Sequence, residues 1–212
     1  MKAIREKVEL PEGHSFRVLR WSKSLREVEC LLGPGRTQPV QGEGDHWHFH
    51  KEVELTLFTG GEGTRFVGDA IGTFGAGDLV LLGERLPHHW HTAGASSGLS
   101  IQWHFPESHP VWAFPENLEL RELFKRAERG LHIRGRTATA IAALMQEVAR
   151  SKGAGQLATL LRLLAEVADS PESDLSLLSS RSFTLSAESH YQKAISKSVQ
   201  HLVANFRDEI RL

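Results

Sequence analysis

Cysteine is nearly absent from this chain: Cys30 is the only one among 212 residues. A single thiol cannot form a disulfide within the chain, so a disulfide-bonded secreted scaffold is excluded. The first residues, MKAIREKVEL, contain no apolar stretch followed by a small-residue cleavage site. No run of about 18 or more apolar residues occurs either, which argues against a transmembrane helix. We therefore expect a cytoplasmic protein that has no membrane partner.

Neither sign of charge is in excess. Lys and Arg number 25, Asp and Glu number 26, and the formal net charge is −1. A domain that itself binds DNA usually carries many more basic than acidic residues, because the phosphates must be neutralised. This chain is not expected to bind nucleic acid on its own, and any contact with DNA has to come from another part of a longer protein.

The first half of the sequence is rich in short strand-like runs. They cover residues 16–21, 25–32, 46–58, 64–67, 79–82, 88–92 and 99–105. Glycine-containing turn signals separate many of them, for example Gly-Pro-Gly at 33–35 and Gly-Ala-Gly-Asp at 75–78. Many short strands at close spacing are typical of a β-sandwich or barrel.

The composition changes near residue 115, after which helical periodicity takes over. Apolar residues recur at helical spacing in 120–127, 141–148 and 157–164, and Gly130 is placed to end the first of these segments. A polar, Ser-rich stretch then runs to about residue 189 and predicts a linker. One more amphipathic segment follows it, with apolar residues at Ile195, Val199, Leu202, Val203 and Phe206.

Histidines and a carboxylate are concentrated in one strand-like run. Alternate residues of a strand share a face, so His48, His50 and Glu54 are predicted to point the same way, with His88 supplied by a neighbouring strand. Nitrogen and oxygen donors that converge in this way suit a first-row divalent metal. The candidate metal ligands are therefore His48, His50, Glu54 and His88, and the candidate ions are Zn²⁺, Ni²⁺, Fe²⁺ and Mn²⁺. Alternatively, the cluster binds an organic ligand through hydrogen bonds without a metal.

Two further residues complete the candidate ligand-binding set. His46 lies on the same predicted face as His48 and is expected near the mouth of the pocket. Trp90 shares a strand face with His88 and is placed to stack on a sugar or another flat ligand. The predicted ligand-binding residues are thus His46, His48, His50, Glu54, His88 and Trp90, and no residue is predicted to be catalytic.

Glycines at both ends of the histidine stretch complete a recognisable spacing. Gly42 and Gly61 flank His48, His50 and Glu54 so that the segment reads G-x5-H-x-H-x3-E-x6-G, which resembles the first cupin motif. The second cupin motif, G-x5-P-x-G-x2-H-x3-N, is kept only in part. Its first glycine and its histidine are matched by Gly77 and His88, whereas Gly83, Arg85 and Thr92 stand at its proline, second glycine and asparagine. The resemblance implies a mostly β fold with helices: a cupin-like double-stranded β-helix, or jelly-roll barrel, followed by an α-helical dimerisation and linker region.

A longer stretch resembles one regulator family. The segment HFHKEVELTLFTGGEGTRFVGDAIGTFGAGDLVLLGERLPHHWH is similar to the N-terminal sensor domain of AraC-type transcriptional regulators. The following helical sequence looks like the family's dimerisation region, and YQKAISKSVQHLVANFRDEIRL resembles the first helix of its helix-turn-helix domain. The resemblance covers about residues 40–212. It implies a cupin-type effector-binding β-barrel at 1–112, a helical dimerisation region at 113–170, a linker at 171–190, and at 191–212 the first helix of a DNA-binding domain otherwise missing from this chain.

We accordingly expect the sensing part of a truncated transcription regulator. A small molecule, with a carbohydrate as one candidate, would bind in the barrel of a homodimer and control sequence-specific DNA binding by the missing domain. The main alternative is a metal-dependent cupin enzyme, a dioxygenase or isomerase that uses the same four ligands. A natural stand-alone cupin and a purely structural interaction module are further alternatives. On the favoured interpretation the protein is not an enzyme.

Overall fold

Residues 4–183 are described by a computed structural model of the chain, and every structural statement refers to this part. The predicted helix at 191–212 and the end of the predicted linker lie outside the described residues. No described helix is both long and apolar enough to cross a bilayer.

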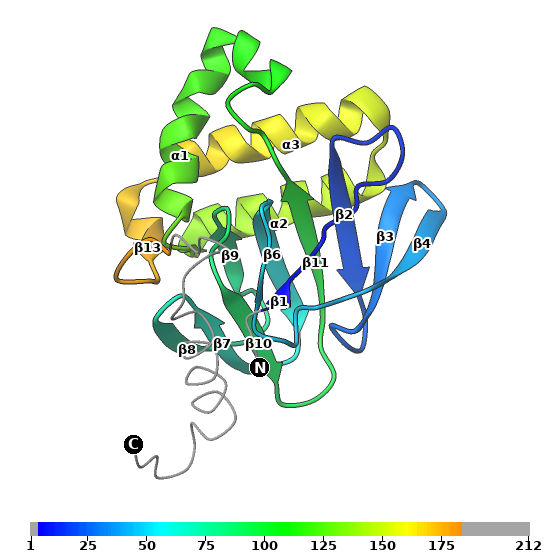
Figure 1. Ribbon diagram of the computed structural model, residues 1–212, viewed down its shortest axis with the longest axis vertical. Coiled ribbons are helices and arrows are strands. Elements are labelled where there is room, and N and C mark those ends of the chain that lie inside the picture. Colours follow the sequence, from blue (N-terminus) through cyan, green and yellow to red (C-terminus); the bar gives the residue numbers. More distant parts are fainter. Residues whose placement is uncertain (1–3, 184–212) are drawn as a thin grey trace.

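Two β-sheets form the main body of the described structure (Figure 1). The small sheet has five strands in the order β1 (Ile4–Arg5), β5 (His48–Phe49), β10 (His88–Thr92), β7 (Gly63–Val67) and β8 (Ala70–Phe74). The large sheet has eight, in the order β13 (Leu175–Leu177), β12 (Leu131–Ile133), β9 (Leu79–Leu82), β6 (Val53–Gly60), β11 (Ser97–Trp103), β2 (Phe16–Trp21), β3 (Glu27–Gly33) and β4 (Arg36–Gln41). All pairings are antiparallel except that of β1 with β5.

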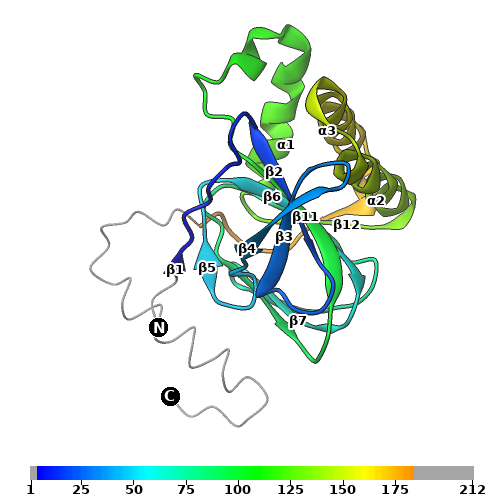
Figure 2. The same cartoon turned by 90° about the vertical axis from the view of Figure 1, so that its right-hand side faces the viewer.

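Helices cover one face of the large sheet. After the 3₁₀ turns η1 (Pro110–Ala113) and η2 (Pro115–Glu119) come α1 (Leu120–Ala127), α2 (Gly135–Arg150) and α3 (Gly153–Ala168), and then the 3₁₀ turn η3 (Glu172–Asp174). Figure 2 shows α2 and α3 on the side of the strands opposite β1 and β5. The first predicted helix ends as expected, since Gly130 has a positive φ of 68° just after it.

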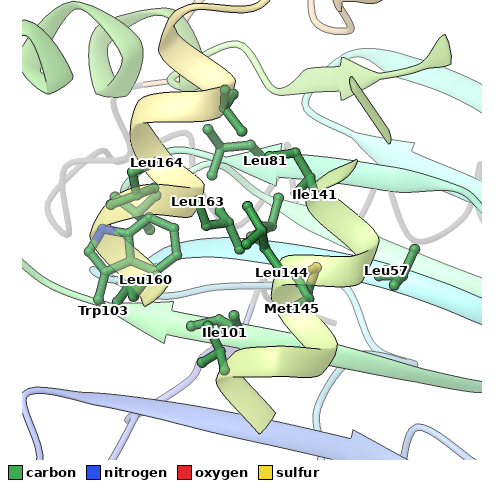
Figure 3. Packing of buried hydrophobic residues seen from close by; sticks show 14 of the residues in the cluster. Leu57, Leu81, Ile101, Trp103, Ile141, Leu144, Met145, Leu160, Leu163 and Leu164 are labelled. Carbon is green, nitrogen blue, oxygen red and sulfur yellow. The ribbon is translucent and has the colours of Figure 1, made fainter. Parts of the chain in front are cut away.

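The large sheet separates two hydrophobic clusters. One lies between this sheet and the helices and includes Leu57, Leu81, Ile101, Leu144 and Leu163 (Figure 3). The other contains side chains of both sheets, and it lies between them. Strand β6 contributes to both sides, because its residues alternate between the two faces. The β-rich fold followed by helices is thus as predicted, with two stacked sheets in place of a closed barrel.

The prediction of one continuous strand at 46–58 was wrong. The chain instead passes from the small sheet to the large one between β5 and β6, with a bend at 51–52. At this point the carbonyl of His50 accepts a hydrogen bond from the backbone N–H of Arg85, 2.7 Å away. Lys51 interrupts the apolar positions of the alternating pattern at this bend, and it was the available sequence signal for it.

The chain returns to the large sheet after its helices. Strand β12 pairs with β9, and β13 pairs with β12. The residue before β13, Asp174, accepts hydrogen bonds from the backbone N–H and the hydroxyl of Thr137, at 3.2 and 2.9 Å, near the start of α2. It satisfies an N-terminal donor of that helix, as a capping residue does. The first part of the predicted linker therefore forms ordered structure that holds α2 against the sheet.

Candidate metal and ligand site

Three buried histidines meet where β5 and β10 pair. His48 and His88 are direct register partners, and His50 follows β5 by one residue. Their potential ligand atoms all lie within 4.8 Å of one another, and each side chain is at most 2% exposed. The ring centroids of His48 and His88 are 4.1 Å apart, and those of His50 and His88 are 5.1 Å apart. This is a compact set of three nitrogen donors.

The orientation of the three rings prepares them to bind a metal. Each Nδ1 donates to a backbone carbonyl, which leaves Nε2 of neutral His48 and His88 as lone-pair donors, whereas Nε2 of His50 is paired with Glu54. The acceptors are the carbonyls of His46, Glu52 and Leu86, at 2.8, 2.9 and 2.8 Å. The Nε2 of His88 is buried and has no hydrogen-bond partner. A buried lone pair without a partner is what a bound cation would satisfy, so the three residues fit a divalent ion.

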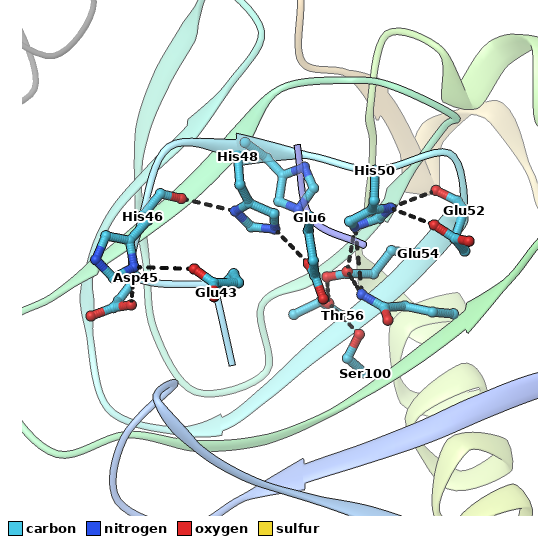
Figure 4. A network of polar contacts seen from close by, with 12 residues as sticks. Glu6, Glu43, Asp45, His46, His48, His50, Glu52, Glu54, Thr56 and Ser100 are labelled. Carbon is cyan, nitrogen blue, oxygen red and sulfur yellow. Dashed lines mark hydrogen bonds and ion pairs between the residues drawn. The ribbon is translucent and has the colours of Figure 1, made fainter. Parts of the chain in front are cut away.

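Glu54 contacts the cluster through one histidine. Its Oε2 lies 3.0 Å from Nε2 of His50 and accepts a hydrogen bond from Nε2 of Gln102 at 2.5 Å, while Thr56 donates to its Oε1 (Figure 4). Burial disfavours the charge on Glu54, but the hydrogen bond from His50 and the nearby His88 hold its pKa well below the ordinary value. Glu54 is not among the mutually close ligand atoms. Its role as a fourth metal ligand stays a prediction.

The three histidines differ in protonation because their surroundings differ. Burial lowers the pKa of His48 and of His88, and the neighbouring histidines lower both further. Burial is also the largest single influence on His50 and acts in the same direction, yet the hydrogen bond to Glu54 and the negative charges of Glu54, Glu6 and Glu52 together outweigh it, so the pKa of His50 is raised. The site therefore holds two neutral rings and one that pairs with a carboxylate.

A second carboxylate, which sequence reasoning missed, lies on the other side of the cluster. Glu6 directly follows β1, with its Oε2 3.5 Å from Nε2 of His48 and its Oε1 2.6 Å from Nη2 of Arg17. The Nε of Arg17 in turn donates to Oε1 of Gln102 at 2.5 Å. A chain of polar contacts thus runs from Glu6 through Arg17 and Gln102 to Glu54. The alternation of polar and apolar residues in β11 was the sequence signal that could have placed Gln102 on the site face. No sequence pattern linked Glu6 to Arg17.

A small, partly open cavity, lined by more apolar than polar surface, adjoins the cluster. Its volume is about 50 Å³, and its wall includes Arg17, His48, Glu54, Trp90 and Gln102. Of the predicted ligand-binding residues, Trp90 lies in this wall, and its indole N–H is buried without a hydrogen-bond partner. His46 is not part of the wall: its side chain is 35% exposed and its Nδ1 lies 2.8 Å from Oδ1 of Asp45.

The structure explains why the second cupin motif is only partly kept. Gly83 stands where the motif has proline, and its N–H donates to the carbonyl of Ala127 at 2.7 Å, which proline cannot do. A Cβ at this position would also lie 2.5 Å from the backbone nitrogen of Glu128. Arg85 stands where the motif has glycine, and it is the one non-glycine residue of the described part with a positive φ, 58°. The contact with the end of α1 thus accounts for glycine in place of proline at position 83.

No family model matches this sequence, and no curated protein matches it. Several solved structures are similar. A cupin 2 conserved barrel domain protein from Salinispora arenicola CNS-205 is 20% identical with a TM-score of 0.30, over 52% of this chain and 79% of that one. The AraC-like transcriptional activator CuxR is 13% identical with a TM-score of 0.44, over 92% and 70%. ToxT from Vibrio cholerae O395, bound to (E)-4-(8-methylnaphthalen-1-yl)but-3-enoic acid, is 10% identical with a TM-score of 0.38, over 93% and 68%.

Proposed function

We propose that this chain is the effector-sensing and dimerising part of an AraC-type transcription regulator. A small molecule binds between the two sheets, and its arrival alters the helices that connect to a DNA-binding domain. The proposal draws on the resemblance of residues 40–212 to that family. The structural observation that carries it is strand β6, whose two faces belong to the site and to the helix-facing core.

Strand β6 lies between the site and the helices. Glu54 and Thr56 belong to the polar contacts of the site, whereas Leu55 and Leu57 belong to the hydrophobic cluster that packs on α2 and α3. A ligand that moves this strand must therefore change helix packing on its other face. For such a ligand to act as an effector, it has to favour one arrangement of the helices over another.

A divalent ion is proposed at His48, His50 and His88, with Glu54 as the predicted fourth ligand. Such an ion, Zn²⁺, Ni²⁺, Fe²⁺ or Mn²⁺, would supply a positive charge that anchors an oxygen atom of the effector. Isothermal titration with ZnCl₂ and NiCl₂ tests this. We expect His88→Ala to weaken binding by more than about tenfold, because a buried ligand is lost. His14→Ala, outside the cluster, is the matched control, and equal affinities in the two variants contradict the metal site.

The outer face of α3 supports a homodimer. Leu157 is 37% exposed, and Ala154 before it and Ala158, Leu161 and Ala165 after it lie at helical spacing along the part of the helix that does not face the core. Such an apolar stripe is suited to packing against the same helix of a second copy. Sedimentation velocity of Leu157→Glu combined with Leu161→Glu tests the proposal, with Ala140→Glu on α2 as the control. We expect the α3 variant to sediment as a monomer and the α2 control to remain a dimer. An unchanged oligomeric state of the α3 variant contradicts this interface.

The DNA-binding part of the proposal is tested at the gene. We expect the reading frame to continue past the codon for Leu212 into two helix-turn-helix units, each of which places a recognition helix in the major groove. A stop codon at that point would contradict the regulator assignment and favour a stand-alone cupin.

One observation favours the alternative function of a metal-dependent cupin enzyme. A divalent ion held by three histidines alone would keep coordination positions open for a substrate. Metal-loaded protein incubated with keto and catechol substrates separates the two functions. A sensor is expected to be stabilised thermally by its ligand and to form no product, whereas steady product formation would establish the enzyme.

A further inference from the structure

We propose that the effector is a small carboxylate, whose carboxylate group binds Arg17 in the place that Glu6 holds in this structure. The inference rests on the proposed sensing function and names the class of molecule sensed. It replaces the expectation of a carbohydrate with a ligand whose charge is complementary to the buried guanidinium of Arg17.

The protein already binds one carboxylate at this position, its own. Glu6 contacts Arg17 at 2.6 Å and lies 3.5 Å from His48, and the side chains of Glu6 and Arg17 are only 10% and 7% exposed. A buried guanidinium is costly without an anionic partner, and it pairs preferentially with planar carboxylates. If Glu6 leaves, Arg17 keeps a hydrogen bond only to the neutral amide of Gln102, and the carboxylate of Glu9 that still attracts it is 75% exposed, so the buried guanidinium favours another anion.

The two members of this ion pair are held with different strength. Arg17 lies within β2, between β11 and β3 in the large sheet, and is fixed further by Gln102. Glu6 instead follows the two-residue strand β1, and its backbone is held by one hydrogen bond from its N–H to the carbonyl of Phe49 at 3.0 Å. Displacement of Glu6 therefore disrupts little of the fold, whereas displacement of Arg17 would disrupt the sheet.

Glu6 and Arg17 also separate two hollows. The inner cavity of about 50 Å³ and an outer hollow of about 540 Å³ share four wall residues: Glu6, Arg17, Gln41 and Glu43. The cavity alone is far smaller than the roughly 300–1,000 Å³ of typical small-molecule sites. When Glu6 moves aside, the two spaces join at Arg17. A carboxylate can then bind the guanidinium while the rest of the molecule occupies the outer hollow beside Leu10 and Val40.

Chemical rescue with acetate tests the inference on the full chain, treated with a chelator to remove metal. Glu6→Ala removes the internal carboxylate and leaves room for acetate. We expect acetate to raise the melting temperature of this variant and to bind at least about tenfold more tightly than to the unmodified protein, in which Glu6 competes. Glu6→Ser provides the same space should the alanine variant fold poorly.

Three controls isolate the carboxylate site. Acetamide has the shape of acetate without its charge, and we expect it to have no effect. Glu6→Gln keeps the volume of the side chain, so acetate should find no space. Glu6→Ala combined with Arg17→Gln lacks the guanidinium and should not respond to acetate. The inference is overturned if acetamide stabilises Glu6→Ala as well as acetate does, or if acetate acts equally without Arg17.

The same variant distinguishes this inference from the proposed function. If Glu6→Ala binds ZnCl₂ through His88 but does not respond to acetate, the carboxylate inference fails and the metal-containing sensor site stands. If acetate binds but no DNA-binding domain follows Leu212, the carboxylate site stands and the regulator assignment fails.

Discussion

Replacement of Gly83 by alanine should destabilise the protein strongly, although the added group is one methyl. A Cβ at this position would lie 2.5 Å from the backbone nitrogen of Glu128 and 2.7 Å from the carbonyl oxygen of Ala127. These are backbone atoms at the end of α1, so relief requires the helix end to move by about 1 Å to restore ordinary contacts. That shift strains the fully buried Ala127 and weakens the 2.7 Å hydrogen bond from Gly83 to its carbonyl.

The magnitude follows from these two effects. Overpacking against an immobile neighbour costs about 1–3 kcal/mol, and a weakened hydrogen bond adds about 1 kcal/mol, for a total loss of about 2–4 kcal/mol. Urea denaturation followed by circular dichroism measures the change. Gly94→Ala is the matched control, because a Cβ there meets no atom within 4 Å and the backbone φ is not positive. If the two variants differ by less than about 0.5 kcal/mol, the proposed contact between α1 and this turn is wrong.

Three further predictions concern other parts of the fold. Arg85→Gly should raise stability by up to about 1 kcal/mol in the same urea experiment, because glycine adopts the positive φ of 58° without strain; a loss of more than that would show that the arginine side chain is needed. Leu163→Ala, fully buried in the helix-facing cluster, should cost about 3 kcal/mol, whereas Leu157→Ala on the exposed face of α3 should cost much less; similar costs would contradict the core assignment. Hydrogen bonds from Ser180 and Ser179 lower the pKa of Asp69 to about 2, so the stability they provide is complete above the unfolded pKa near 4 and is lost as the pH falls towards 2. Thermal melts should therefore show a smaller loss between pH 4 and pH 2 for Asp69→Asn than for the unmodified protein, and identical slopes would refute the contribution.

The strands and helices that the sequence predicted share a clear periodicity. Strands β2, β9 and β10 have the predicted bounds, and the three helical segments became α1, α2 and α3. Strand β4 was missed because its residues, RTQPVQ, are polar and contain Pro39, so they show no alternating pattern. Strands β12 and β13 have three residues each, too few for periodicity to be recognised.

The candidate site was predictable only as far as its motif extends. The spacing of His48, His50 and His88 led correctly to a histidine cluster, although the strand predicted to carry the first two bends between the sheets. Glu6 and Arg17 were not predictable, because their contact depends on the parallel pairing of the N-terminal strand with β5. A local pattern carries no information about which distant segment will lie against it.

The large sheet ends in strands that are poor templates for another chain. At one edge, β13 offers only three residues, and at the other, β4 contains Pro39, which lacks the N–H that a further strand would need. Both borders thus discourage the addition of strands from neighbouring copies, a route that leads to open-ended fibres. The proposed α3 interface would instead close after two copies, because the same surface of each copy faces the other.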